Sequence, residues 1–185
     1  MLYIILGVSI VIFIIAIMVT ISYNKFRFAI IKIDEAENNI EVLLKKKVDL
    51  LDRTRPIIKK ELKMDNFIED IEFLKESEIN HFEMNNSLKK YYDELIKVLD
   101  EHEKLLKSET LTSIMDEIKD NEESILGCTK FYNDSVVVFN KLVGSFPSNI
   151  VAFFWHYKRK EFYNNEKREM YEILKTEDYD CVATR

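Results

Sequence analysis

Hydrophobic residues are distributed along this chain in two different ways. Between Leu2 and Ser22 they form an almost unbroken run of Ile, Val, Leu and Phe, and no charged side chain occurs before Lys25. A helix over this run would be roughly 31 Å long, which matches a bilayer hydrocarbon core of about 30 Å. After Lys25 the apolar residues recur every three or four positions among polar ones, as in amphipathic helices. The pattern predicts a transmembrane helix followed by a helical body.

The spacing also predicts the elements of the body. No helix stop signal lies between Ser22 and Arg55, so the first helix continues out of the apolar run, and Pro56 predicts a kink or break. The region 64–107 is periodic and forms either one helix or two. A third stripe ends at the loop 144–149, and a last, shorter helical region is expected over 150–174.

Each predicted helix has one apolar face, so the helices must pack together, most economically in an antiparallel arrangement. We therefore predict an all-α fold with an N-terminal transmembrane helix over 2–22. An elongated antiparallel helical bundle of about four helices follows over 23–174, and a flexible polar tail covers 175–185.

A cleaved signal peptide and a buried core helix are the alternatives to an anchor. A signal peptide has a basic n-region and a small-residue cleavage site, and neither Met1–Tyr3 nor Ile21–Tyr23 supplies them. A core helix fits poorly with an uncharged run of this length. The sequence therefore favours an uncleaved anchor in the lipid bilayer.

Basic residues predict the orientation of the anchor. Lys25, Arg27 and Lys32 follow the apolar run, and none precedes it. Basic residues near a span stay in the cytoplasm. We expect a single-pass protein of the cell membrane with a short N-terminus outside and the body in the cytoplasm.

Composition narrows the class of partner. The net charge is -6, from 33 acidic and 27 basic residues, and this acidic balance disfavours nucleic acid as a partner.

Composition also narrows the class of fold. Only three Gly and two Pro occur, which is too few for a sheet fold with many turns. Cys128 and Cys181 form no spaced cluster, so no disulfide framework or zinc ribbon is expected.

Several segments along residues 1–163 carry a family pattern. They are Tyr23-Asn24, Ile33–Ala36, Ile40–Leu51, Phe131–Asp134, Phe139-Asn140, Ser145–Ala152 and Phe162-Tyr163. On these residues the chain resembles the LemA family of bacterial membrane proteins. The resemblance implies a single-pass anchor and a cytoplasmic bundle of about four helices, and it implies no reaction.

The chain departs from the family pattern in two places. Of the family's basic-x-Asp-Leu-Ile-Pro-Asn run, Lys47 and Asp49 are present, but Asp52 stands where proline is expected. Residues 64–110 match only in their helical periodicity. No functional feature of that region in relatives transfers to this chain.

Chemistry-bearing motifs are sparse. A di-iron bundle needs two Glu-x-x-His motifs, and this chain has one, Glu78 to His81. Cys128 has no histidine at helical contact spacing, and no nucleophile elbow or glycine-rich phosphate loop occurs. His102 lies on the apolar stripe and is expected to be a core or boundary residue. We therefore expect no cofactor, no metal and no enzymatic activity.

Polar residues in the matching segments are candidates for interaction or for setting helix register. They are Asn24, Asp34, Asp49, Asn133 and Asn140. Asn133 and Asn140 are seven positions apart and so share a helix face. An amide on a bundle seam fixes register, and the alternative is a polar patch that receives a partner.

Acidic residues form a strip on the first helix. Asp34, Glu41 and Asp49 are spaced at about two turns. The basic residues that oppose them are Lys45, Lys46, Lys47 and Arg53. This pattern predicts a solvated face with local i,i+4 ion pairs.

An aromatic and basic group follows the 144–149 loop. Its candidate interface residues are Phe146, Pro147, Trp155, Lys158, Arg159 and Lys160. Such a group suits a membrane interface, and the alternatives are a distal docking site or part of the core. If 64–110 is one return helix, the loop follows three crossings and lies far from the membrane.

Three functions remain open at this point. The first is a non-enzymatic scaffold or adaptor for other membrane or cytoplasmic proteins. The second is a homo-oligomeric organiser of the membrane that binds itself, and the third is a metal-binding or enzyme-associated subunit.

Overall fold

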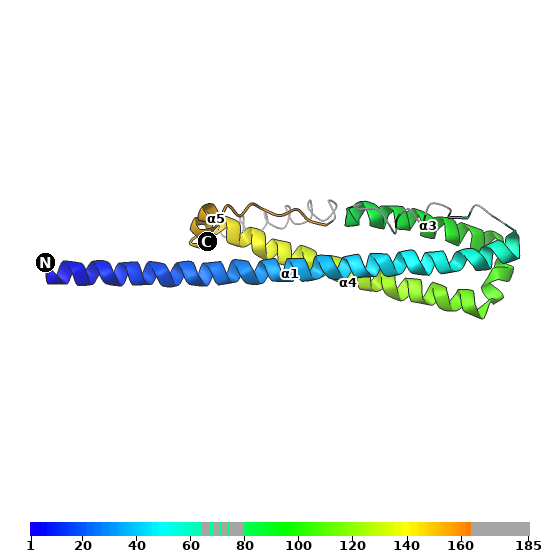
Figure 1. Cartoon of the computed structure of the whole chain (residues 1–185), viewed down its shortest axis with the longest axis horizontal. Coiled ribbons are helices and arrows are strands. Elements are labelled where there is room, and N and C mark those ends of the chain that lie inside the picture. The colour runs from blue at the N-terminus through cyan, green and yellow to red at the C-terminus, as the bar shows by residue number, and fades with distance from the viewer. Residues whose placement is uncertain (64–66, 69–70, 72–73, 75–79, 164–185) are drawn as a thin grey trace, which may run out of the picture. The chain divides into compact units, whose positions relative to one another are not determined.

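The computed structural model describes residues 1–63, 67–68, 71, 74 and 80–163. Its helices are α1 (Leu2–Leu62), α3 (His81–Glu101), the 3-10 helix η1 (Glu103–Lys107), α4 (Glu109–Gly144) and α5 (Ser148–Phe154) (Figure 1). The described residues contain no strand. The prediction of an all-α fold is confirmed.

Helix α1 is uninterrupted from Leu2 to Leu62. It contains Pro56, so the predicted break does not occur there. Proline costs a helix one hydrogen bond and a clash, but Ile58 is fully buried beyond it and Pro56 itself is exposed. Burial of the following turn offsets the local cost, and the helix ends only at Lys63, whose φ is 54°.

The apolar run forms the start of α1. Its length and composition suffice to cross a membrane, and its most apolar stretch of 18 residues contains no residue buried in the protein. Among the described residues, α4 and α5 meet the same test only as a bent pair, with 89° between them.

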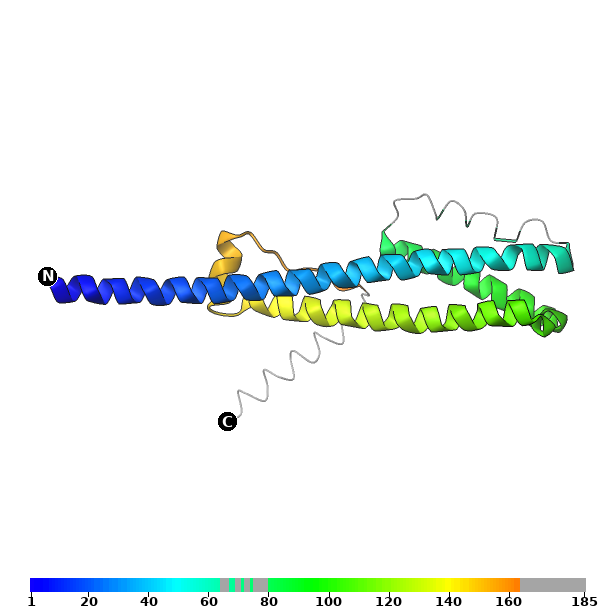
Figure 2. The same ribbon diagram turned by 60° about the horizontal axis from the view of Figure 1, so that its bottom comes forward.

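The chain divides into two compact units. Unit 1 combines residues 1–36 with the chain from Lys130 onward, and unit 2 is Glu37–Thr129. Figure 2 shows α4 running alongside α1 within each unit.

The core of unit 1 lies between the two long helices and α5. Its buried members are Phe26, Ala29, Ile33, Val136, Phe139, Val151 and Ala152. Phe26 is at the centre, with its ring 5.6 Å from that of Phe139 and 4.8 Å from that of Tyr157. Because Lys32 lies near the ring of Phe131 while Phe26 meets Phe139, the two helices are antiparallel here.

Helix α5 is much shorter than the helical region expected over 150–174. It ends at Phe154, and His156 has a φ of 57°, which no helix continues. The backbone N–H of Tyr157 donates to Ala152 across this turn. Residues 156–163, here called the return segment, are not helical; the rest of the expected helix and the tail 175–185 lie outside the described residues.

In unit 2, α3 has the same direction as α1. It starts with His81, whose Nε2 is 3.9 Å from Glu41 Oε2, and ends where His102 and Leu62 line one pocket. Helix α4 runs the opposite way, since Asn121 meets Leu43 and Glu117 meets Arg53. The idea of one continuous return helix over 64–110 is therefore wrong, and α4 is the helix that runs back along α1.

Candidate functional site: the aromatic end of unit 1

The loop after α4 lies beside the end of the apolar run of α1. Ser148 Oγ is 3.4 Å from Ser22 Oγ, and both serines are buried. The rings of Trp155 and Tyr23 are 5.6 Å apart. The distal placement expected from three crossings is wrong, because α3 does not run back along α1.

Helix α5 has one buried side and one exposed side. Ser148, Val151 and Ala152 are buried against the core of unit 1. The exposed apolar residues of the loop and α5 are Phe146 (75%), Ile150 (46%), Phe153 (78%), Phe154 (67%) and Trp155 (47%). We call these five residues the aromatic end.

The basic residues that follow differ in their surroundings. Lys158 and Arg159 are exposed, and Lys160 is half-buried. A Cβ placed on Gly144 would lie 3.4 Å from Arg159 Nη2, so this guanidinium sits at the C-terminal end of α4. A cation at this end of a helix is favoured by the helix dipole.

Asparagine side chains hold the return segment against α4. Asn140 Nδ2 donates to the carbonyl of Lys160, and the Lys160 N–H donates to Asn140 Oδ1, each at 2.9 Å. Asn133 Oδ1 accepts the backbone N–H of Tyr163 at 2.9 Å. The hydroxyl of Tyr132 donates to the carbonyl of Glu161 at 3.3 Å. Side chains of α4 thus replace the backbone hydrogen bonds that a further helix would have made.

Of the five candidate polar residues, Asn133 and Asn140 therefore bind the return segment of the same chain. Asn133 is fully buried, and its Nδ2 has no partner in the described part of the protein. Asn24, Asp34 and Asp49 are exposed on α1. The structure brings together Asn133 and Asn140 with the segment 160–163, and it does not bring the other three to this site.

None of the three acidic residues of the strip is buried, and the departure from the predicted solvated face is the basic residue Lys47. Lys45 donates to Glu41 at 2.6 Å, an i,i+4 pair that lowers the pKa of Glu41 by hydrogen bonding and by charge. Lys47 is different, because its side chain is 1% exposed and pairs with Glu122 of α4. Lys47 lies at helical spacing from the buried residues Ile40, Leu44 and Leu51. This spacing is a sequence signal from which its burial could have been predicted.

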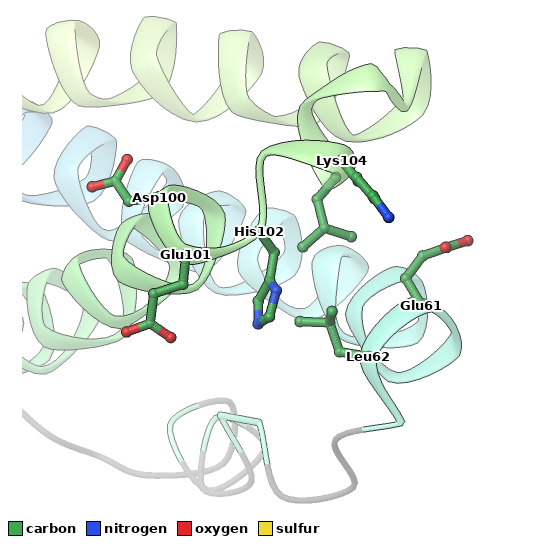
Figure 3. Close-up of a pocket in the computed structure, with 7 residues that line it drawn as sticks. Glu61, Leu62, Asp100, Glu101, His102 and Lys104 are labelled. Atoms are coloured by element: carbon green, nitrogen blue, oxygen red, sulfur yellow. The ribbon is translucent and has the colours of Figure 1, made fainter.

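Unit 2 has a pocket of about 520 Å³ where α1 and α3 end (Figure 3). Its lining residues are Glu61, Leu62, Asp100, Glu101, His102, Lys104 and Leu105. His102 and Leu62 point toward one another across it (Figure 3). His102 is an exposed residue at the C-terminal cap of α3, so the expectation of a core or boundary residue is wrong.

Metal ligation has no cluster to support it in the residues that the structure describes. No group of three or more His, Cys, Asp or Glu side chains there could hold an ion. Glu78, the first half of the Glu-x-x-His motif, lies outside those residues, and His81 faces Glu41.

Several contacts of the site were not anticipated. Ser22 and Ser148 join the loop to α1, and Tyr157 covers Phe26. Tyr163 packs edge-on against Tyr132, with ring centroids 6.1 Å apart. The contact between Ser22 and Ser148 has one signal in the sequence, which is that Ser22 is a polar residue at the end of the apolar run.

In a comparison with protein-family models, the model of the LemA family matches residues 36–176. The chain belongs to the LemA family. The matched residues include α3, α4, the aromatic end and both asparagines that hold the return segment. No curated protein matches the chain. The predicted family is confirmed, and membership assigns no activity.

Proposed function

We propose that this LemA-family protein is a single-pass, membrane-anchored scaffold that receives other proteins at the cytoplasmic side of the cell membrane, and that it is not an enzyme. One observation carries the proposal. The core of unit 1 begins within the last turn of the apolar run, because Val19 and Tyr23 already pack against the cluster around Phe26. A protein built this way has its folded body directly on the bilayer, without a linker.

The first part of α1 supports membrane anchoring by its surface. Its Ile, Leu, Val and Phe side chains between positions 2 and 15 are each more than half exposed. Exposing such a side chain to water costs roughly 1.5–3 kcal/mol relative to burying it. Lys25, Arg27 and Lys32 follow the run and support a cytoplasmic body.

A second surface of unit 1 supports a scaffold role. Phe28 of α1 is 62% exposed, and Phe131 and Val138 of α4 are 38% and 53% exposed. Lys32 Nζ is 4.6 Å from the ring centroid of Phe28 and 6.0 Å from that of Phe131, so these residues adjoin. We call Phe28, Lys32, Phe131 and Val138 the lateral face; adjoining exposed apolar residues mark interaction sites.

Site-specific photo-crosslinking in cells tests this function. A photoreactive amino acid at Phe131 or Val138 of the full chain is expected to give a defined adduct with another protein. The same probe at the exposed Asp34 is the control and is expected to give none. An adduct of twice the 22.1 kDa chain mass would support the homo-oligomeric organiser instead, and adducts equal at all three positions would contradict a specific scaffold surface.

A further inference from the structure

We propose that the aromatic end is a second membrane contact, which lies in the headgroup region of the same bilayer that α1 crosses. The inference rests on the proposed anchor, and its occupant is a lipid surface. It concerns the five exposed residues Phe146, Ile150, Phe153, Phe154 and Trp155.

The first argument is the level of α5 along α1. Ser148 meets Ser22, and Trp155 meets Tyr23. Ser22 is the last residue of the apolar run, and the first charge follows at Lys25. The aromatic end is therefore at the height where α1 leaves the hydrocarbon core.

The second argument is direction. Helix α4 runs antiparallel to α1 in unit 1, and α5 is bent from α4 by 89°. A seven-residue helix at this angle lies across the anchor, in the plane of the membrane surface. Amphipathic segments that bind membranes lie in this plane, with their apolar side chains toward the acyl chains.

The third argument is the chemistry of the exposed side. Of the residues of α5 that face outward, Asn149 alone is polar, whereas Ile150, Phe153 and Phe154 are apolar. Tyr and Trp concentrate where a bilayer meets water; Tyr3 lies at the start of the apolar run, and Tyr23 directly follows its end. Trp155 packs beside Tyr23 and so adds a second aromatic ring at the cytoplasmic end of the span.

The fourth argument is charge. Lys158 and Arg159 are exposed immediately after the aromatic end. Basic residues beside an apolar membrane contact attract anionic headgroups. The aromatic end is therefore apolar where it meets the acyl boundary, and the basic residues that follow it meet the headgroups.

Trp155 reports on this contact because it is the only tryptophan of the chain. The full chain is reconstituted in vesicles of phosphatidylcholine and phosphatidylglycerol, and vesicle flotation measures anchoring separately. Lipids brominated near the headgroup end of the acyl chain are expected to quench Trp155 emission at least twofold, and lipids brominated deep in the bilayer less. Iodide in the buffer is expected to quench it weakly.

A matched pair of variants separates the contact from the anchor. In Phe153→Ser/Phe154→Ser, iodide quenching of Trp155 is expected to rise severalfold while flotation is unchanged. Leu126→Ser, which removes an apolar side chain of α4 that is 65% exposed, is expected to change neither readout.

Three outcomes would overturn the inference. If the chain floats with vesicles while brominated lipids leave Trp155 unquenched, α5 does not touch lipid although the anchor holds. If Trp155 is open to iodide in vesicles but shielded in isolated native membranes, a protein covers the aromatic end instead. If the chain does not float, the proposed anchor itself fails, and the inference fails with it.

Discussion

The side-chain amide of Asn140 forms both of its hydrogen bonds with one residue, Lys160, at 2.9 Å each. An amide that pairs with the N–H and C=O of one residue fixes that residue much as a neighbouring β-strand would. The return segment is thereby fixed on α4 without any secondary structure of its own. Tyr157 of that segment covers the core residue Phe26, so the amide also helps close the core of unit 1.

Asn140→Ala is expected to destabilise unit 1 by about 1–3 kcal/mol, because it leaves the N–H and C=O of Lys160 without their partner. Asn133→Ala is expected to cost less, since Asn133 makes one bond to the segment and its Nδ2 already lacks a partner. Hydrogen exchange of the Lys160 amide, with the exposed Asn39→Ala as control, measures this directly. Equal exchange in Asn140→Ala and wild type would show that the amide does not hold the segment.

Alkaline pH is expected to release the return segment through Tyr163. Burial raises the pKa of Tyr163 to about 12, above its ordinary value of 10.0. Stability from the neutral, folded phenol is complete below pH 10 and is lost as the pH rises toward 12, because the unfolded phenol ionises first. The difference in stability between wild type and Tyr163→Phe should therefore shift with pH only in this window.

Phe26 and Phe28 form a matched pair on one helix, because Phe26 is fully buried and Phe28 is 62% exposed. Phe26→Ala is expected to destabilise the protein by about 3–5 kcal/mol, through lost burial and a cavity between Phe139 and Tyr157. Phe28→Ala is expected to stay within about 0.5 kcal/mol of wild type. Denaturant titration by circular dichroism distinguishes the two, and similar losses in both variants would contradict the assigned core.

The pair between Lys47 and Glu122 is expected to respond unequally to removal of its two members. Glu122→Gln leaves the buried ammonium of Lys47 without its counter-charge, at a cost on the order of 3 kcal/mol. Lys47→Met keeps the apolar stem and leaves Glu122, which is 38% exposed, in contact with water, so its cost is expected to be about 1 kcal/mol or less. The neighbouring exposed Glu123→Gln is the control, and the reverse order of the two losses would refute this account of the pair.

The elements with a local signature were predictable from the sequence. The apolar run, the stripe of Ile40, Leu44 and Leu51, and the 144–149 loop all depend on spacing that the chain itself displays. Asn133 and Asn140 were recognised as one face because they are seven positions apart. Their partner was not, since each hydrogen bond joins residues 20 or 30 positions apart and no local pattern encodes such a pairing.

The remaining misses have a common physical cause, which is tertiary packing that overrides local preference. Pro56 does not end α1 because Ile58 is buried beyond it. Lys47 looked solvated because of its charge, but its long apolar stem lies on the buried stripe. The distal position of the loop depended on one return helix over 64–110, and the direction of α3 is set by long-range contacts that periodicity does not reveal.

The central claim is that α1 anchors the protein in the cell membrane with its body in the cytoplasm. Its most direct test is protease digestion of intact cells and of sealed inside-out membrane vesicles, with blotting for an epitope on the body. The account predicts that the protein stays with the membrane after alkaline carbonate extraction, is protected in intact cells and is digested in inverted vesicles. Release by carbonate, or digestion in intact cells with protection in inverted vesicles, would contradict it.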